Sequence, residues 1–353
     1  MDLSLFFFAD GSAGTDRYDL LLDSARFADE HGLHAVWTPE RHFHEFGGQY
    51  PNPAVTSAAL AAVTQRLAIR AGSIVAPLHH PIRIAEEWSV VDNLSNGRVG
   101  VSFASGWHAR DFVFQPGNYD HRRNVMAETV GTVRRLWRGD LIEFEAPAGT
   151  CDVRLYPRPV QAELPVWITA AGSSQTYQMA GRLGTGVLTH QLTQDHTALE
   201  RGISLYREAL AESHGPDVPG HVVVMLHTLL GDDRGQVREL VRTPLIEYLR
   251  SSMDLLSKAP ASPSSDGFDV NRVSRDDREF LLERAFDRIF DQAGLFGTVD
   301  DGIETARRLA AIGVDEIACL IDFGVASDVV FDSLKHLELL QEQIHAIRGA
   351  DFR

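Results

Sequence analysis

Short apolar runs alternate with segments of helical periodicity along almost the whole chain. The runs predict eight strands, at residues 3–8, 35–38, 67–76, 99–103, 166–169, 186–189, 221–230 and 316–321. The segments that follow them place apolar residues three or four positions apart and predict helices at residues 18–31, 53–63, 81–94, 121–137, 174–183, 196–213, 236–256 and 328–347. Two more helical patterns, at residues 277–291 and 300–312, precede the last strand.

Eight strand–helix units over this length predict a parallel α/β fold that closes as a (β/α)8 TIM barrel. We expect residues 1–353 to form a single barrel domain. The alternative is an open, doubly wound sheet, which normally carries a glycine-rich turn after its first strand. The corresponding stretch, ADGSAGTD, lacks that fingerprint. The pattern therefore favours the closed barrel.

Two insertions interrupt the alternation of strands and helices. Residues 141–159 have the pattern of a β-type excursion. Residues 258–275, KAPASPSSDGFDVNRVSR, are rich in proline, serine and aspartate, a composition typical of a mobile loop. Because this loop precedes the eighth strand, we expect it to act as a lid over the active face of the barrel.

Charge and cysteine content narrow the possible partners and the compartment. The formal net charge is −16, from 33 basic and 49 acidic residues, and such a surface repels nucleic acid. Cys151 and Cys319 are too far apart in sequence to indicate a disulfide framework or a metal motif. No apolar run is long enough for a signal peptide or a membrane span. The sequence predicts a cytoplasmic protein.

The segment after the second strand, PERHFHEFGGQYPNP, is dense in ionisable and aromatic groups. His42 and His44 flank Phe43, and a His-x-His pair on an extended segment is a possible metal motif. No third ligand is evident, so we expect no metal. The favoured role is one histidine facing the barrel mouth as an acid, a base or a hydrogen-bonding group.

Small residues at other strand ends predict a ligand site. Backbones approach a flat ligand closely where side chains are small, at Gly72 and Ser73 on the third strand and at Ser105 and Gly106 after the fourth. Further rim residues follow these strands and the sixth: Ile74, Trp107, His108, Thr189 and His190.

A helix begins directly after the fifth strand, in the stretch ITAAGSSQTYQMAG. Free backbone N–H groups at a helix N-terminus bind anions, and Gly172, Ser173 and Thr176 supply a turn and hydroxyl groups there. The alternative is an ordinary serine-capped helix. The small residues at the end of the neighbouring fourth strand favour a phosphate site.

These segments resemble the bacterial luciferase-like flavin monooxygenases over nearly the whole chain. The resemblance is carried by ERHFHEFG, IVAPLHHPIRIAEEWSVVDNLSNGRVGVSFASGWHARDF, ITAAGSSQTYQMAGRLGTGVLTH and GVDEIACLIDFG. Within the family, FASGWHARDF and GTGVLTH most resemble the monooxygenase domains of polyketide and nonribosomal peptide assembly lines. The resemblance implies a (β/α)8 barrel that uses reduced FMN and O2.

The resemblance also assigns roles to residues of this chain. It implies that Gly172, Ser173 and Thr176 bind the flavin phosphate, that Ser105, Gly106 and Trp107 lie beside the flavin ring and that Gly72, Ser73 and Ile74 lie behind it; Thr189 and His190, at the rim after the sixth strand, complete the predicted cofactor-binding residues. It places His42 near the reactive edge of the flavin, with Arg41 and His108 as further catalytic candidates. It also predicts a non-proline cis peptide at Gly72-Ser73 or Ser73-Ile74.

Several positions depart from luciferase itself. Arg41 stands in place of the first histidine of a catalytic pair, Ala104 in place of a reactive cysteine, and Ser105 in place of a phosphate-binding arginine. These departures argue against light emission and an aldehyde substrate. They favour a flavin borrowed from a separate reductase, since no reductase module is present.

The sequence thus predicts an FMN-dependent monooxygenase of natural-product biosynthesis that oxygenates an acyl or aminoacyl intermediate. That substrate is either free or bound to a carrier protein, and we expect the enzyme to be a homodimer. Two alternatives stay open. One is a deazaflavin-dependent oxidoreductase of the same fold, and the other is a flavin-binding protein without turnover.

Overall fold

The computed structural model describes residues 1–8, 18–257 and 275–347 of the chain. The lid predicted at residues 258–275 lies almost entirely outside the described residues, so it stays a prediction.

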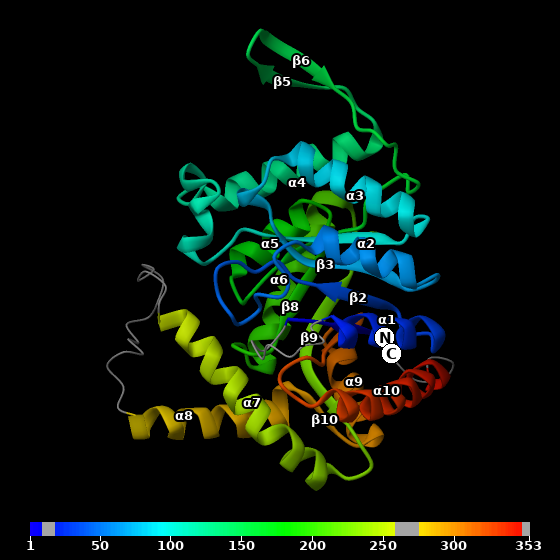
Figure 1. Ribbon diagram of the computed structural model, residues 1–353, viewed down its shortest axis with the longest axis vertical. Coiled ribbons are helices and arrows are strands. Elements are labelled where there is room, and N and C mark those ends of the chain that lie inside the picture. The colour runs from blue at the N-terminus through cyan, green and yellow to red at the C-terminus, as the bar shows by residue number, and fades with distance from the viewer. Residues whose placement is uncertain (9–17, 258–274, 348–353) are drawn as a thin grey trace.

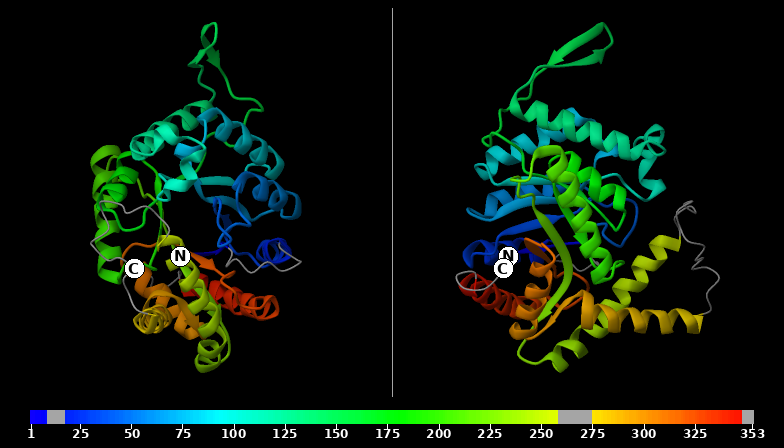
Figure 2. Two further views of the ribbon diagram at one scale, coloured as in Figure 1. Left: turned by 60° about the vertical axis from the view of Figure 1, so that its left-hand side comes forward. Right: turned by 180° about the vertical axis from the view of Figure 1, so that it is seen from behind.

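Eight parallel strands form a closed barrel, as predicted (Figure 2). They are β1 (Asp2–Phe6), β2 (Ala35–Thr38), β3 (Ala68–Val75), β4 (Val99–Ala104), β7 (Val166–Thr169), β8 (Gly186–His190), β9 (Val222–Leu230) and β11 (Glu316–Leu320). Their order is β9-β11-β1-β2-β3-β4-β7-β8, and pairing of β8 with β9 closes the ring. The sequence pattern missed β10 (Leu295–Gly297), a short strand that pairs with β9.

Helices surround this barrel (Figure 1). They are α1 (Asp19–Glu30), α2 (Pro53–Val63), α3 (Pro81–Ser95), α4 (Arg122–Arg138), α5 (Ser174–Arg182), α6 (His196–His214), α7 (Arg234–Ser257), α8 (Arg275–Arg288), α9 (Val299–Ala311) and α10 (Ser327–Ile347). Local chemistry sets their ends. Asn52 caps α2 by accepting from the amides of Ala54 and Val55, and a capping box of Thr298 and Asp301 begins α9.

Two excursions leave the barrel. The β-type insertion is confirmed as an antiparallel hairpin of β5 (Ile142–Ala146) and β6 (Gly149–Val153), which projects from the molecule in Figure 1. Helices α7 and α8 extend together on another side (Figure 2), and ion pairs such as Arg242–Glu283 join them. Residues 289–293 continue α8 as a short π-helix before β10.

Alternate residues along β1 and β2 enter two separate hydrophobic clusters. Leu5 and Val36 belong to the cluster between strands and helices, whereas Phe6 and Trp37 belong to the second one. This alternation follows from the period of two in a β-strand, and the second set fills the barrel interior.

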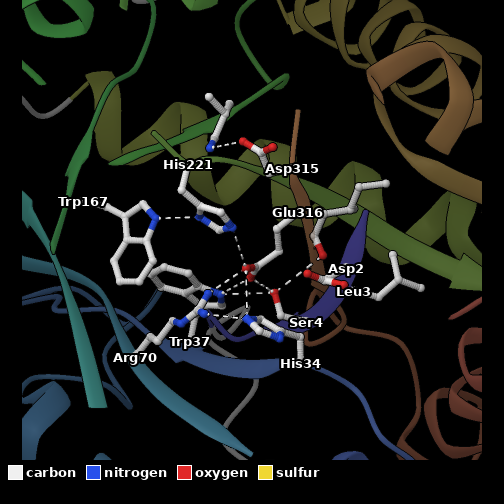
Figure 3. A network of polar contacts seen from close by, with 12 residues as sticks. Asp2, Leu3, Ser4, His34, Trp37, Arg70, Trp167, His221, Asp315 and Glu316 are labelled. Carbon is white, nitrogen blue, oxygen red and sulfur yellow. Dashed lines mark hydrogen bonds and ion pairs between the residues drawn. The ribbon is translucent and has the colours of Figure 1, made fainter. Parts of the chain in front are cut away.

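A polar network closes the N-terminal end of the barrel (Figure 3). Glu316, fully buried at the start of β11, accepts hydrogen bonds from Arg70 Nη1 at 2.7 Å, Ser4 Oγ at 2.6 Å and Trp37 Nε1 at 3.0 Å. The Arg70 guanidinium lies between the rings of Trp37 and Trp167, at 4.8 and 4.6 Å from their centroids. These groups provide one another's hydrogen-bond and charge partners. They lie at the N-terminal end of the barrel, whereas barrel enzymes build their active sites at the C-terminal end.

Among the helices that the structure describes, none combines the length and the apolar character needed to span a bilayer.

Candidate active site

The predicted site residues gather at the C-terminal ends of the barrel strands. Because the strands are parallel, the segments after β2, β4, β7 and β8 and the end of β3 share one face. The structure therefore places every sequence-predicted site residue at this face.

A buried carboxylate organises the segment after β2. Glu40 Oε1 lies 2.7 Å from His42 Nε2 and 2.6 Å from His79 Nε2, and Glu40 Oε2 accepts from the Val75 amide at 2.7 Å. Burial alone would raise the pKa of Glu40, but hydrogen bonds from the two histidine rings hold it below its ordinary value. Burial alone would lower the pKa of His79, but its hydrogen bond to Glu40 raises it.

The sequence analysis assigned no role to Glu40 or His79. They lie 39 positions apart, so only the closing of the barrel shows that one carboxylate binds both histidines. The available signal was a glutamate two residues before His42, on a strand end.

His42 and His44 make different contacts. The His42 side chain is 9% exposed and packs edge-on against Phe114, with ring centroids 4.9 Å apart. His44 Nδ1 instead accepts a hydrogen bond from the Phe46 amide at 3.1 Å. The prediction of an extended segment here was wrong, because the backbone between them turns at Phe43, which has a φ of 56°.

The end of β3 carries the predicted irregularity. The Gly72-Ser73 peptide is cis, which confirms the expectation, and the register with β4 shifts between Gly72 and Ile74. The hydroxyl groups of Ser73 and Ser102 both contact Thr169 Oγ1. A Cβ on Gly72 would lie 2.7 Å from the Phe6 ring, so only glycine fits there.

The segment after β4 contributes a cluster of charged and aromatic groups. Trp107 is 48% exposed, and the Arg41 guanidinium carbon lies 5.2 Å from its ring centroid. Next to it, buried His108 places Nδ1 3.4 Å from Asp111 Oδ1. Burial raises the pKa of Asp111, although His108 and Arg41 oppose this rise. Gly106 has a φ of 76°, a conformation that favours glycine at this turn.

The N-terminus of α5 is open to a ligand. Ser173 occupies the cap position, but its side chain makes no capping hydrogen bond, and Gly172 before it has a φ of 102°. Arg123 of α4 donates to Gln175 Oε1 in the first turn of α5 at 2.9 Å. The sequence reasoning missed this arginine, which adds positive charge at a helix N-terminus that already favours anions.

Two buried histidines, His190 at the end of β8 and His227 on β9, lie in an apolar environment. Burial lowers the pKa of His190 to about 4, and burial, with a smaller effect of His190, lowers the pKa of His227 on β9 to about 3. Both are neutral at neutral pH, and in the described part of the chain neither His190 Nδ1 nor His227 Nε2 has a hydrogen-bond partner. Thr189 Oγ1 already contacts Tyr177 and Gln194, so its hydroxyl also ties β8 to α5.

A metal centre has no support in the described residues, where no group of three or more His, Cys, Asp or Glu side chains could hold an ion.

The fold and the sequence both match known proteins. The sequence profile of a family described as luciferase-like monooxygenase matches residues 1–316. The alkanal monooxygenase alpha chain of Photorhabdus luminescens is 25% identical over 332 residues, covering 89% of this chain and 88% of that protein. The oxygenase component of a flavin-dependent trigonelline monooxygenase from Acinetobacter baylyi is 27% identical over 222 residues, 61% of this chain and 60% of that protein.

Solved structures share the fold. The monooxygenase RslO1 from Streptomyces bottropensis superposes with a TM-score of 0.80 at 22% identity, covering 98% of this chain and 100% of the other. The oxygenating constituent of 3,6-diketocamphane monooxygenase from Pseudomonas putida, in complex with FMN, has a TM-score of 0.73 at 18% identity and covers 98% and 97%.

Proposed function

Because this chain belongs to the luciferase-like monooxygenase family, we propose that it is the oxygenase of a two-component system. It receives reduced FMN from a separate reductase and adds one oxygen atom of O2 to an organic substrate. The family and the use of a flavin agree with the class that the sequence predicted. One observation carries the proposal. The N-terminus of α5, which lacks a side-chain cap, and His42, which is hydrogen-bonded to Glu40, lie on the same face of the barrel.

The residues at this face fit a flavin mononucleotide. The first turn of α5, the Ser173 hydroxyl and Arg123 form a site with the charge and geometry for a phosphate. Two buried polar atoms that have no partner among the described residues, His190 Nδ1 and Gln191 Oε1, lie at the end of β8 and can hydrogen-bond a polar ring. The bulge at the end of β3 and the turn at Gly106 bring backbone close to the same region.

Bound reduced FMN supplies the electrons that activate O2, and the protein supplies proton control. Ionised Glu40 only accepts hydrogen bonds, so His42 Nε2 carries a proton toward it. His42 Nδ1 is then the ring atom that gives or takes a proton at the reacting oxygen. Glu40, itself held by the Val75 amide, fixes both the orientation and the tautomer of this ring.

Flavin titrations test the cofactor assignment. We expect oxidised FMN to bind weakly and reduced FMN to bind more tightly under anaerobic conditions. The Arg123→Gln variant should bind both oxidised and reduced FMN more weakly, because it removes the cation beside α5. Arg138→Gln, at the other end of α4, is the matched control and should bind FMN as the wild type does. Stoichiometric yellow flavin that survives purification would contradict a cofactor borrowed from a reductase.

Substitution of the two histidines tests the proton role. We expect His42→Ala to bind reduced FMN but to release most of its electrons as hydrogen peroxide, with product formation lowered by about 100- to 10,000-fold. The His44→Ala control should stay coupled, because His44 serves the loop backbone. Coupling is measured as product formed per NADH with a partner reductase. If His44→Ala loses coupling and His42→Ala keeps it, the proton role belongs to His44. If both variants stay coupled, this segment lines the site but takes no part in proton transfer.

A deazaflavin coenzyme is the second candidate. A deazaflavin (F420)-dependent secondary alcohol dehydrogenase shares the fold, with a TM-score of 0.69 at 18% identity. Anaerobic reconstitution with each reduced coenzyme separates the two, since only reduced FMN should yield oxygen incorporation. A protein that binds flavin but consumes no NADH with any reductase would instead be a non-catalytic relative.

Natural-product biosynthesis, an acyl or aminoacyl substrate that is either free or bound to a carrier protein, and a homodimer are further parts of the proposal. Exposed apolar side chains on α2 and α3, Val55, Val90 and Leu94, with Tyr156 beside them, support association of two copies. Light scattering during size-exclusion chromatography tests the dimer. Mass spectrometry of pathway products with and without this protein tests the substrate.

A further inference from the structure

We propose that Arg41 binds a carboxylate group of the substrate at the barrel mouth. The inference rests on the proposed oxygenase function and deepens it by naming the chemical class of the substrate, an organic acid.

Arg41 is a buried cation that forms no ion pair with any carboxylate of the described residues. The residue is 7% exposed, and its Nε has no hydrogen-bond partner among the residues that the structure describes. Within the part of the chain that the structure describes, no ion pair or side-chain hydrogen bond involves its guanidinium. Arg70, the comparable buried arginine at the other end of the barrel, is bound by Glu316 at 2.7 Å. Because an isolated buried charge is costly, Arg41 is matched to an anion that comes from outside the chain.

The protein holds Arg41 in place without an anion. The guanidinium lies 5.5 Å from the Phe8 ring centroid and 5.2 Å from that of Trp107. The Arg41 amide donates to the Tyr50 carbonyl at 2.9 Å. A Cβ on Gly47 would lie 2.7 Å from Arg41 Cγ, so the glycine leaves room for the aliphatic part of the Arg41 side chain. An arginine whose guanidinium lies against aromatic rings and whose aliphatic part is closely packed is preorganised to bind a ligand.

Asp111 does not fill the role of a partner. Its charge acts on Arg41 electrostatically and opposes the lowering of the Arg41 pKa by burial, but no hydrogen bond or ion pair joins the two side chains. The Asp111 Oδ1 atom lies 3.4 Å from His108 Nδ1 instead. The His108 ring lies 5.3 Å from that of Trp107, which Arg41 also contacts, and its Nε2 has no partner among the described residues, so it is available as a second donor or acceptor.

Carboxylate chemistry fits this arrangement better than phosphate chemistry does. The planar guanidinium fork matches a planar carboxylate, and a single cation balances a single negative charge. The site suited to a dianionic phosphate is the first turn of α5 with Arg123. A free organic acid supplies the carboxylate, whereas a simple acyl thioester on a carrier protein lacks it at the reacting end.

Calorimetric titration of the flavin-free full-length protein tests the proposal with matched probes. Hexanoate and benzoate are compared with hexanamide and benzamide, which keep the shape but lose the charge. We expect each carboxylate to bind about 10- to 100-fold more tightly than its amide, as for a charge-assisted hydrogen bond. Arg41→Gln should abolish this preference and Arg41→Lys should retain part of it. Arg110→Gln, an exposed arginine on the same rim, should leave it unchanged.

Three results would overturn the proposal. They are equal affinity of acids and amides for the wild type, a preference that persists in Arg41→Gln, and a loss of FMN affinity in Arg41→Gln without binding of any acid. The last result would identify the flavin as the anion. The wild-type comparison decides even if a variant misfolds. Acid binding without flavin turnover would refute the oxygenase function alone, so the two failures are distinguishable.

Discussion

Replacement of Glu316 should destabilise the barrel in a way that depends on pH. Burial alone would raise the pKa of Glu316, but Arg70 and the neighbouring histidines lower it to about 2 from an ordinary value of 4.5. Each pKa unit corresponds to about 1.36 kcal/mol, so the ionised carboxylate contributes about 3 kcal/mol to the free energy of unfolding at neutral pH. Glu316→Gln removes this contribution and leaves buried Arg70 without its carboxylate, a loss of about 3–5 kcal/mol.

The sign of the pH dependence follows from the lowered pKa. Above pH 4.5 the carboxylate is ionised in both states and its contribution is complete. Between pH 4.5 and about 2 the unfolded state binds the proton first, so the contribution disappears as the pH falls. The difference in unfolding free energy between wild type and Glu316→Gln should therefore be largest at pH 7 and should shrink toward pH 3.

Urea unfolding at several pH values provides the measurement. Tryptophan fluorescence reports on Trp37 and Trp167, which flank Arg70, and circular dichroism reports on the whole chain. Asp332→Asn, at an exposed carboxylate on α10, is the control and should leave the urea midpoint nearly unchanged. A difference between wild type and Glu316→Gln that is the same at pH 7 and pH 3 would refute the reasoning.

Two further predictions address the active face. Glu40→Gln should lower the pKa of His79, followed by NMR of the ring protons, and Glu87→Gln should lower it less; an unchanged pKa in both would show that Glu40 does not control this ring. Gly72→Ala should lower the free energy of unfolding by about 1–3 kcal/mol, because its Cβ would lie 2.7 Å from a buried ring of β1. Gly117→Ala, where a Cβ meets nothing within 4 Å, is the matched control, and equal urea midpoints for the two variants would contradict this.

The hydrophobic pattern by itself determined the architecture. Four-residue runs such as Ala35–Thr38 and Val166–Thr169 were predicted at their observed bounds, as was the helix Pro53–Val63 that Asn52 caps. These elements are specified by local periodicity and by capping residues, so the chain order of strands and helices predicts the barrel. It also places the residues after each strand on one face.

What the sequence could not supply were contacts between segments far apart in the chain. The left-handed backbone at Phe43 redirects the segment after β2. The sequence carries no sign that Glu40 binds both His42 and His79, or that Arg123 lies at the first turn of α5. Side-chain pairing across a barrel depends on register and rotamers, which one sequence does not reveal.

Two arginines show most clearly what the sequence determines and what only the tertiary structure decides. In the sequence Arg41 follows the second strand and Arg70 lies on the third, and neither position indicates whether the charge is neutralised inside the protein. Only the tertiary structure gives Arg70 the carboxylate of Glu316, 246 positions away, and leaves Arg41 buried beside the Phe8 and Trp107 rings without a carboxylate from the described residues. Composition and periodicity determine that a charged residue lies at a strand end. Whether its charge is neutralised inside the protein depends on which distant side chain the closed barrel brings within reach, and at Arg41 it brings none of those described.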